Sequence, residues 1–140
     1  MTENYKIMGS FIKDMSSETP DTPTYIFVKD KITKYKLNID ITSKAVKEGI
    51  IEVNTTIRFS DQPEILKKAH FEIIYTSIVR VDEKVSDKKE MEKIILCDVP
   101  NKIYPDLERI FLNLLTDSGY PGIKFEKKVD FTELYKQKQS

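Results

Sequence analysis

The sequence predicts an α+β fold in which one four-stranded antiparallel sheet is followed by helices. Apolar and polar residues alternate through most of the first half of the chain, which is typical of strands with one buried face. After about residue 88, apolar residues recur every three or four positions, which is typical of amphipathic helices. The 140 residues suffice for one domain, which we expect to span residues 1–140 with flexible ends at 1–4 and 137–140.

Four segments carry the strand pattern. The first, KIMGSFIKDMSSE, is expected to place Ile7, Phe11 and Met15 on the buried face and Ser10, Asp14 and Glu18 on the exposed face. Pro20 and Pro23 should end it, because proline cannot donate to a ladder. The other three are YKLNIDIT, IEVNTTIRF after a turn at Gly49, and, beyond the SDQPE break, AHFEIIYTSIVRV, which exposes His70 and Glu72.

The second half of the chain predicts three helical regions. They are a short helix in DKKEMEKIILCD, a long helix over residues 105–118 that stops at Gly119, and a last helix in VDFTELYKQK. Pro100 and Pro105 bracket a kinked connection between the first two. Asp130 and Glu133 have the spacing of a capping box at the start of the last helix.

Composition excludes several classes of protein. The 23 basic and 23 acidic residues cancel, so no overall field favours nucleic acid or membranes, and basic residues are not striped with aromatics. The single cysteine excludes an internal disulfide and suits a reducing compartment. The first residues lack the pattern of a signal peptide, and no apolar run approaches the ~20 residues of a membrane span. We therefore expect a soluble, cytoplasmic protein.

Candidate catalytic residues are few. His70 as general base and Cys97 as nucleophile are the best pair, but a surface histidine and a packed thiol explain both equally simply. One histidine and one cysteine do not supply a tetrahedral zinc site, and four glycines leave little room for a phosphate loop. We expect no metal, no cofactor and no enzymatic activity. A small α+β enzyme or ligand-binding domain near His70 or Cys97 remains the alternative from a different class.

Two other features suggest binding. Asp14, Glu18 and Glu72 lie on exposed strand faces, where charge is normal but where a basic partner could dock. Aromatic residues gather near the breaks of the pattern, where they either fill the core or line a groove for extended apolar polypeptide: Tyr25, Phe27, Tyr35, Phe131 and Tyr135.

The chain resembles the SecB family of protein-export chaperones over about 120 residues, and four segments carry the resemblance. They are FIKDMSSETPDTPTYIF, with the family's Lys-Asp and Ser-x-Glu-x-Pro spacing; HFEIIYTSIVRV, with Glu72 at an acidic position; VPNKIYPDLERI, with the Pro-Asn-x-aliphatic-aromatic-Pro junction; and GYPGIKFEKKVDFTELYKQK. All four occur in the family's order, which makes the signal specific.

The resemblance implies an ATP-independent chaperone that holds unfolded precursor proteins and passes them to the SecA motor. It implies SecA binding by Asp14, Glu18 and Glu72. It implies a client groove lined by Tyr25, Ile26, Phe27, Tyr35, Phe131, Leu134 and Tyr135. It further implies a homotetramer, a dimer of dimers, whose interface contains Leu107, Phe111, Leu114 and Leu115.

The chain departs from the family pattern at three places. His70 stands where an apolar residue is common, Arg109 falls one position late in the helix motif, and the chain ends in KQKQS rather than in an acidic tail. A histidine beside the motor-binding acid would make that contact sensitive to pH. A nearer alternative function is a SecB-like chaperone dedicated to one client, such as an antitoxin.

Overall fold

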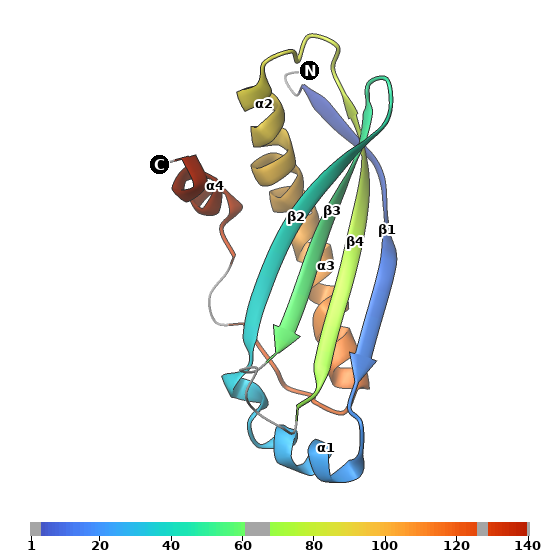
Figure 1. The fold of residues 1–140 in the computed structure, drawn as a ribbon, viewed down its shortest axis with the longest axis vertical. Coiled ribbons are helices and arrows are strands. Elements are labelled where there is room, and N and C mark those ends of the chain that lie inside the picture. The colour runs from blue at the N-terminus through green and yellow to red at the C-terminus, as the bar shows by residue number, and fades with distance from the viewer. Residues whose placement is uncertain (1–3, 61–67, 126–128, 140) are drawn as a thin grey trace.

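The computed structural model describes residues 4–60, 68–125 and 129–139, and it has the predicted α+β architecture (Figure 1). The strands are β1 (Tyr5–Glu18), β2 (Lys36–Lys47), β3 (Ile50–Ser60) and β4 (His70–Val81). They form one antiparallel sheet in the order β1-β4-β3-β2, so β1 and β2 are its edges. Residues 61–64 of the predicted break, and residues 1–3 and 140 of the predicted flexible ends, lie outside the described residues.

The sheet has two unlike faces. We call the face that packs on α2 and α3 the helix face, and the opposite one, on which no described helix packs, the outer face (Figure 1). On the helix face, Phe71 and Ile57 meet Phe111 of the long helix in a dry core, and the rings of Phe59 and Phe111 are edge to face with centroids 5.9 Å apart. Burial of this apolar face holds the helices on the sheet.

The crossover between β1 and β2 contains a helix that the sequence did not predict. Helix α1 (Thr22–Lys29) starts at Asp21, whose carboxylate accepts a hydrogen bond from the Thr24 backbone N–H at 2.8 Å. Pro23 lies in the first turn, where its missing N–H costs nothing. The 3-10 turn η1 (Ile32–Lys34) then leads into β2. β1 thus ends before Pro20, as predicted, and the cap at Asp21 starts a helix in the crossover.

The long helix begins earlier than predicted. Helix α2 (Lys88–Lys93), the π-helical segment η2 (Ile94–Asp98) and α3 (Val99–Asp117) follow one another without a gap. The first turns of α3 therefore stand where the kinked connection between Pro100 and Pro105 was expected. Pro100 fits the first turn of α3, and Pro105 lies inside the helix. None of the described helices is both long and apolar enough to span a membrane.

The last helix, α4 (Phe131–Gln139), begins as the capping pattern predicted. The Asp130 carboxylate accepts a hydrogen bond from the Glu133 backbone N–H at 3.2 Å. Phe131 is fully buried, with its ring 5.4 Å from that of Tyr104 on α3. This contact fixes the start of α4 beside the β2 edge of the sheet (Figure 1).

Candidate functional site

The three acidic residues singled out in the sequence lie together on the outer face. Asp14 and Glu18 belong to β1, and Glu72 belongs to the adjacent β4. Glu72 pairs directly with Ser16, which lies midway between the other two acids. Each is therefore a diagonal neighbour of Glu72, at a typical distance of about 7–8 Å. We call Asp14, Glu18 and Glu72 the acidic surface.

Two β-bulges in β1 decide which of its side chains reach this face. The register with β4 shifts on both sides of residues 9–12, and each extra residue reverses the direction of the side chains. Ser10 consequently lies on the helix face, 3.0 Å from the Ser77 hydroxyl, whereas Phe11 pairs with Thr76 on the outer face. The predicted alternation is therefore wrong for Ser10 and Phe11 and correct for the acids beyond the second bulge.

Glu72 differs from the other two acids because it is paired. The Arg58 Nε on β3 is 2.7 Å from the Glu72 Oε2, and the two residues face each other directly in the register. The side chains stay 54% and 31% exposed, respectively. Asp14 and Glu18 make no ion pair with any residue of the described ranges. The acidic surface thus has two free carboxylates and one that is engaged within the chain.

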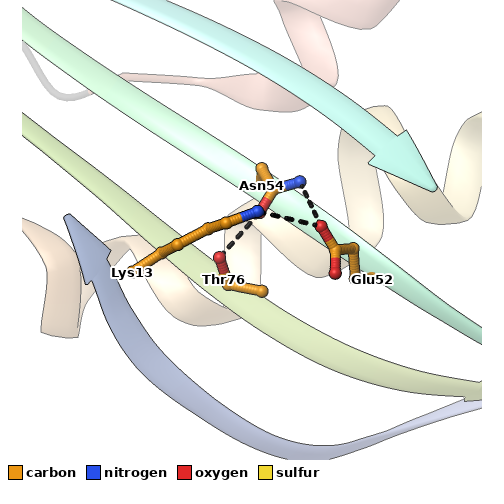
Figure 2. Close-up of polar contacts among 4 residues, drawn as sticks. All are labelled: Lys13, Glu52, Asn54 and Thr76. Carbon is orange, nitrogen blue, oxygen red and sulfur yellow. Dashed lines mark hydrogen bonds and ion pairs between the residues drawn. The ribbon is translucent and has the colours of Figure 1, made fainter. Parts of the chain in front are cut away.

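Next to this surface, a polar network binds the carboxylate of a fourth acid, Glu52 (Figure 2). Lys13 reaches from β1 across β4, and its Nζ lies 3.3 Å from the Glu52 Oε2 on β3. Asn54 Nδ2 donates to the same oxygen at 2.9 Å, and the hydroxyl of the buried Thr76 donates to the Asn54 Oδ1 at 2.6 Å. The hydrogen bond from Asn54, with help from Lys13, holds the pKa of Glu52 below its usual value. The network ties β1 to β3 and compensates the negative charge of Glu52 within the chain.

The structure does not bring His70 and Cys97 together. His70 is exposed on the outer face opposite Glu18, whereas Cys97 is buried in η2 on the other side of the sheet. The Cys97 sulfur contacts the Thr132 hydroxyl at 3.4 Å and accepts from the Asn101 amide at 3.6 Å. These contacts hold the start of α4 against η2 and α3, so the thiol has a structural role. In the described ranges, no cluster of three or more acidic, histidine or cysteine side chains is placed to hold a metal ion.

A second candidate site runs along the β2 edge. Three pockets, with volumes of about 740, 500 and 200 Å³, follow one another from η1 to α4. The first two share Leu37, and the last two share Ile39 and Leu134, so the three pockets are neighbours along the strand, and we call them together the β2 groove. Its apolar lining residues are Ile32, Tyr35, Leu37, Ile39, Ile41, Phe59, Leu96, Ile123, Phe125, Val129, Phe131, Leu134 and Tyr135.

Four of the seven predicted groove residues line the β2 groove: Tyr35, Phe131, Leu134 and Tyr135. Leu134 is the most accessible of them, with 47% of its surface exposed. Tyr35 and Phe131 are buried and contribute mainly to the floor. The hydroxyl of Tyr135 donates to the Lys89 backbone oxygen at 3.3 Å, which holds α4 against α2.

The other three predicted groove residues lie on α1 and line none of these pockets. The Tyr25 hydroxyl donates to the Gly119 backbone oxygen at 2.8 Å, so this residue anchors α1 to the end of α3. Ile26 is 62% exposed, and Phe27, 37% exposed, lies under the Lys31 ammonium. These two make an apolar patch apart from the β2 groove, and their part in client binding stays a prediction.

Several groove residues were missed from the sequence. Leu37 and Ile39 had been assigned to the buried face, which is the correct face of the sheet, yet both are only half-buried. β2 is an edge strand, and the helices do not cover it completely. No signal in the alternation distinguishes an edge strand from a central one. Phe125 gave no signal either, because it lies in an irregular segment.

The long helix turns its predicted interface residues inward. Leu107, Phe111 and Leu115 are completely buried in the core of this chain, and Leu114 is half-buried. A second chain packing on α3 would meet its opposite side, which exposes Arg109 and Asn113. The tetramer interface itself stays a prediction.

Comparison with known proteins gives one family. The family model described as preprotein translocase subunit SecB matches residues 1–140. The chain is 91% identical over 138 residues to a putative protein-export protein SecB of Pelagibacter ubique, with 99% of each chain covered. It is 24% identical over 133 residues to the protein-export protein SecB of Methylocella silvestris, covering 95% of this chain and 81% of the relative.

Among solved structures, the fold is similar to that of a SecB-like chaperone of Mycobacterium tuberculosis, solved in complex with a peptide from an antitoxin. The TM-score is 0.63 at 13% sequence identity, with 89% of this chain and 91% of the other covered. At this identity the similarity concerns the fold.

Proposed function

The chain belongs to the SecB family, and we propose that it is a cytoplasmic, ATP-independent export chaperone that holds unfolded precursor proteins and delivers them to the SecA motor. The β2 groove is the observation that carries the proposal. It combines an apolar lining with a strand edge to which no strand of the described ranges is paired. Such an edge binds extended polypeptide through main-chain hydrogen bonds, and the adjacent apolar pockets add affinity without demanding one sequence.

The length of the groove fits a short client segment. The lining residues of β2 run from Leu37 to Ile41, beside Tyr35 at the start of the strand. At ~3.3 Å per residue, Tyr35 to Ile41 spans about 20 Å, enough for about six extended residues. A precursor that remains unfolded exposes many such segments, so several grooves in one assembly would hold it by avidity.

A refolding assay tests the chaperone activity. A reduced, unfolded precursor is diluted into buffer without nucleotide, and its aggregation is followed by light scattering with and without the purified chain. We expect suppression by the wild type and a several-fold loss for Leu134→Asp, which places a charge in the groove. Val46→Asp is the matched control, because Val46 is similarly exposed at 55% but lines none of the three pockets. No suppression by the wild type would contradict the proposal.

Ile26→Asp belongs in the same assay. If the apolar patch on α1 takes part in holding clients, this variant should lose activity as Leu134→Asp does. If Ile26→Asp behaves like Val46→Asp, the client site is limited to the β2 groove.

The acidic surface supports docking to SecA. Its three carboxylates lie on one face, away from the β2 groove, so a client and the motor could bind at the same time. Complementary charge orients partners and speeds their association. We expect Asp14→Lys and Glu72→Lys to reduce capture of purified SecA while leaving suppression of aggregation unchanged. Equal capture by wild type and both variants would remove SecA docking from the proposal.

The second candidate function is that of a chaperone dedicated to one client. It is favoured by the structurally similar SecB-like chaperone, which was solved in complex with a peptide from an antitoxin. The near-identical relative named for protein export favours the general export role. A dedicated chaperone would suppress aggregation of one client only and would not require the acidic surface.

A further inference from the structure

Within the acidic surface, Glu72 is already bound by a basic residue of the same chain, Arg58. We propose that Arg58 occupies Glu72 and thereby weakens docking of the basic surface of SecA, so that the partner must displace Arg58 before it can use this carboxylate. This inference rests on the proposed docking of SecA at the acidic surface. Arg58 would then limit the affinity of the chain for SecA. Asp14 and Glu18 would be available for contact at once, whereas Glu72 would become available only after its ion pair with Arg58 opens.

The geometry gives Arg58 this position. It faces Glu72 directly from β3, with the Nε and the Oε2 2.7 Å apart, whereas Asp14 and Glu18 flank Glu72 from the β1 side. A partner approaching all three acids therefore meets the Arg58 guanidinium at the border of the surface. Because both members of the pair remain partly exposed, the pair can open without uncovering the core.

Two other cations of the outer face, Lys13 and Arg80, do not share this role. Lys13 is engaged with Glu52 in the network of Figure 2. Arg80 lies at the far end of β4, opposite Lys6. It is eight residues from Glu72, or about 26 Å along the strand at ~3.3 Å per residue. Salt screens charges at that separation, so Arg80 offers a matched control with the same change in net charge.

The size of the effect follows from the nature of the pair. Exposed ion pairs contribute an amount that corresponds to about 1.4- to 5-fold in an equilibrium constant. We therefore expect Arg58→Met to tighten SecA binding by about 1.4- to 5-fold at low salt. Raising the salt from about 0.1 M to about 1 M shortens the Debye length from about 10 Å to about 3 Å, and the gain should shrink accordingly.

The experiment measures the affinity of full-length chain for purified SecA by titration. The variants are Arg58→Met, Arg58→Gln, Arg80→Met, Asp14→Asn, Glu72→Gln and the double variant with both Arg58→Met and Glu72→Gln. Thermal unfolding confirms that each variant is folded. The expected result is tighter binding for both Arg58 variants and no change for Arg80→Met. The loss caused by Glu72→Gln should be larger in the Arg58→Met background than in the wild type, because the carboxylate is then fully available.

Each other outcome overturns the inference. Weaker binding on loss of Arg58 would mean that the arginine itself contacts the motor. An equal gain for Arg80→Met would mean that only net charge matters. If Asp14→Asn weakens binding but the Arg58 variants leave it unchanged, this inference fails and SecA docking stands. If the wild type does not bind SecA, both fail together.

Discussion

At the scale of single residues, the buried hydroxyl of Tyr104 stands out. It has no hydrogen-bond partner in the described structure, and burial, followed by the nearby negative charge of Glu108, raises the pKa of Tyr104 to about 12. An unsatisfied buried polar group costs roughly 1–3 kcal/mol. We expect Tyr104→Phe to raise the free energy of unfolding by about 1 kcal/mol, measured by urea denaturation, because the contact with Phe131 is kept.

Tyr120→Phe is the matched control for this prediction. Tyr120 is also buried, but its hydroxyl lies 2.9 Å from that of Thr19. Removing one partner of that bond should lower the free energy of unfolding by about 1 kcal/mol. A loss of the same size in both variants would show that the Tyr104 hydroxyl is satisfied.

Glu52 predicts a pH dependence. Its folded-state pKa lies below the usual value of 4.5, so the carboxylate stabilises the fold above that value, and this contribution is lost as the pH falls through the folded-state pKa. We expect Glu52→Gln to be less stable than the wild type near neutral pH, with the difference shrinking as the pH is lowered below 4.5. Free energies of unfolding at several pH values measure it.

The acidic residues could be predicted from the sequence, whereas their counter-ion could not. Glu72 follows from alternation within β4, and Asp14 and Glu18 keep their predicted face because the reversals at the two bulges of β1 cancel. The pair of Arg58 with Glu72 depends on which residue of β3 stands opposite β4. That register is set by the whole sheet, and no local pattern contains it.

At the scale of elements, the junction of α1 with the end of α3 depends on Gly119. This glycine has a φ of +102°, and a Cβ there would lie 2.8 Å from the Tyr25 ring, which is fixed by its hydrogen bond to the Gly119 oxygen. Gly119→Ala therefore combines backbone strain of about 1–2 kcal/mol with loss of a hydrogen bond of about 1 kcal/mol. We expect a loss of about 2–3 kcal/mol in the free energy of unfolding.

Gly122→Ala separates these two causes. Gly122 has a φ of +81°, but nothing lies within 4 Å of the position of a Cβ, so only the strain of about 1–2 kcal/mol should remain. In a Tyr25→Leu background the difference between the two alanine variants should largely disappear. If the difference between the two alanine variants persists unchanged, the Tyr25 ring is not the cause of the larger loss in Gly119→Ala.

The element boundaries show where sequence patterns lose information. Alternation identified all four strands, yet the bulges around residues 9–12 reversed the faces of Ser10 and Phe11. A bulge adds one residue without a distinctive composition, so the pattern alone does not reveal it. Similarly, Pro105 was expected to begin the long helix, but the helix packs on the sheet from Val99 onward, and that packing outweighs the local cost of an internal proline.

At the scale of the whole molecule, the sheet leaves both of its edges open in the described structure, and they differ in character. The β2 edge borders the groove. The β1 edge is a strand of 14 residues whose exposed apolar side chains are Met8, Phe11, Ile12 and Met15. Long apolar edge strands are rarely left uncovered in stable proteins. The fold class followed from periodicity, but neither edge could be assigned a role until the order of the strands was known.

The dimer of dimers that the family resemblance implies requires two kinds of interface, and the β1 edge and the exposed side of α3 are the candidates. We expect Phe11→Asp to disrupt the β1 contact and Asn113→Lys to disrupt the α3 contact, each halving the mass measured by light scattering after size-exclusion chromatography. Both changes together should give single chains of 16.3 kDa. Val46→Asp, similarly exposed but away from both surfaces, should keep the wild-type mass. A single-chain mass for the wild type, or an unchanged mass in the double variant with the fold intact by circular dichroism, would contradict this assembly.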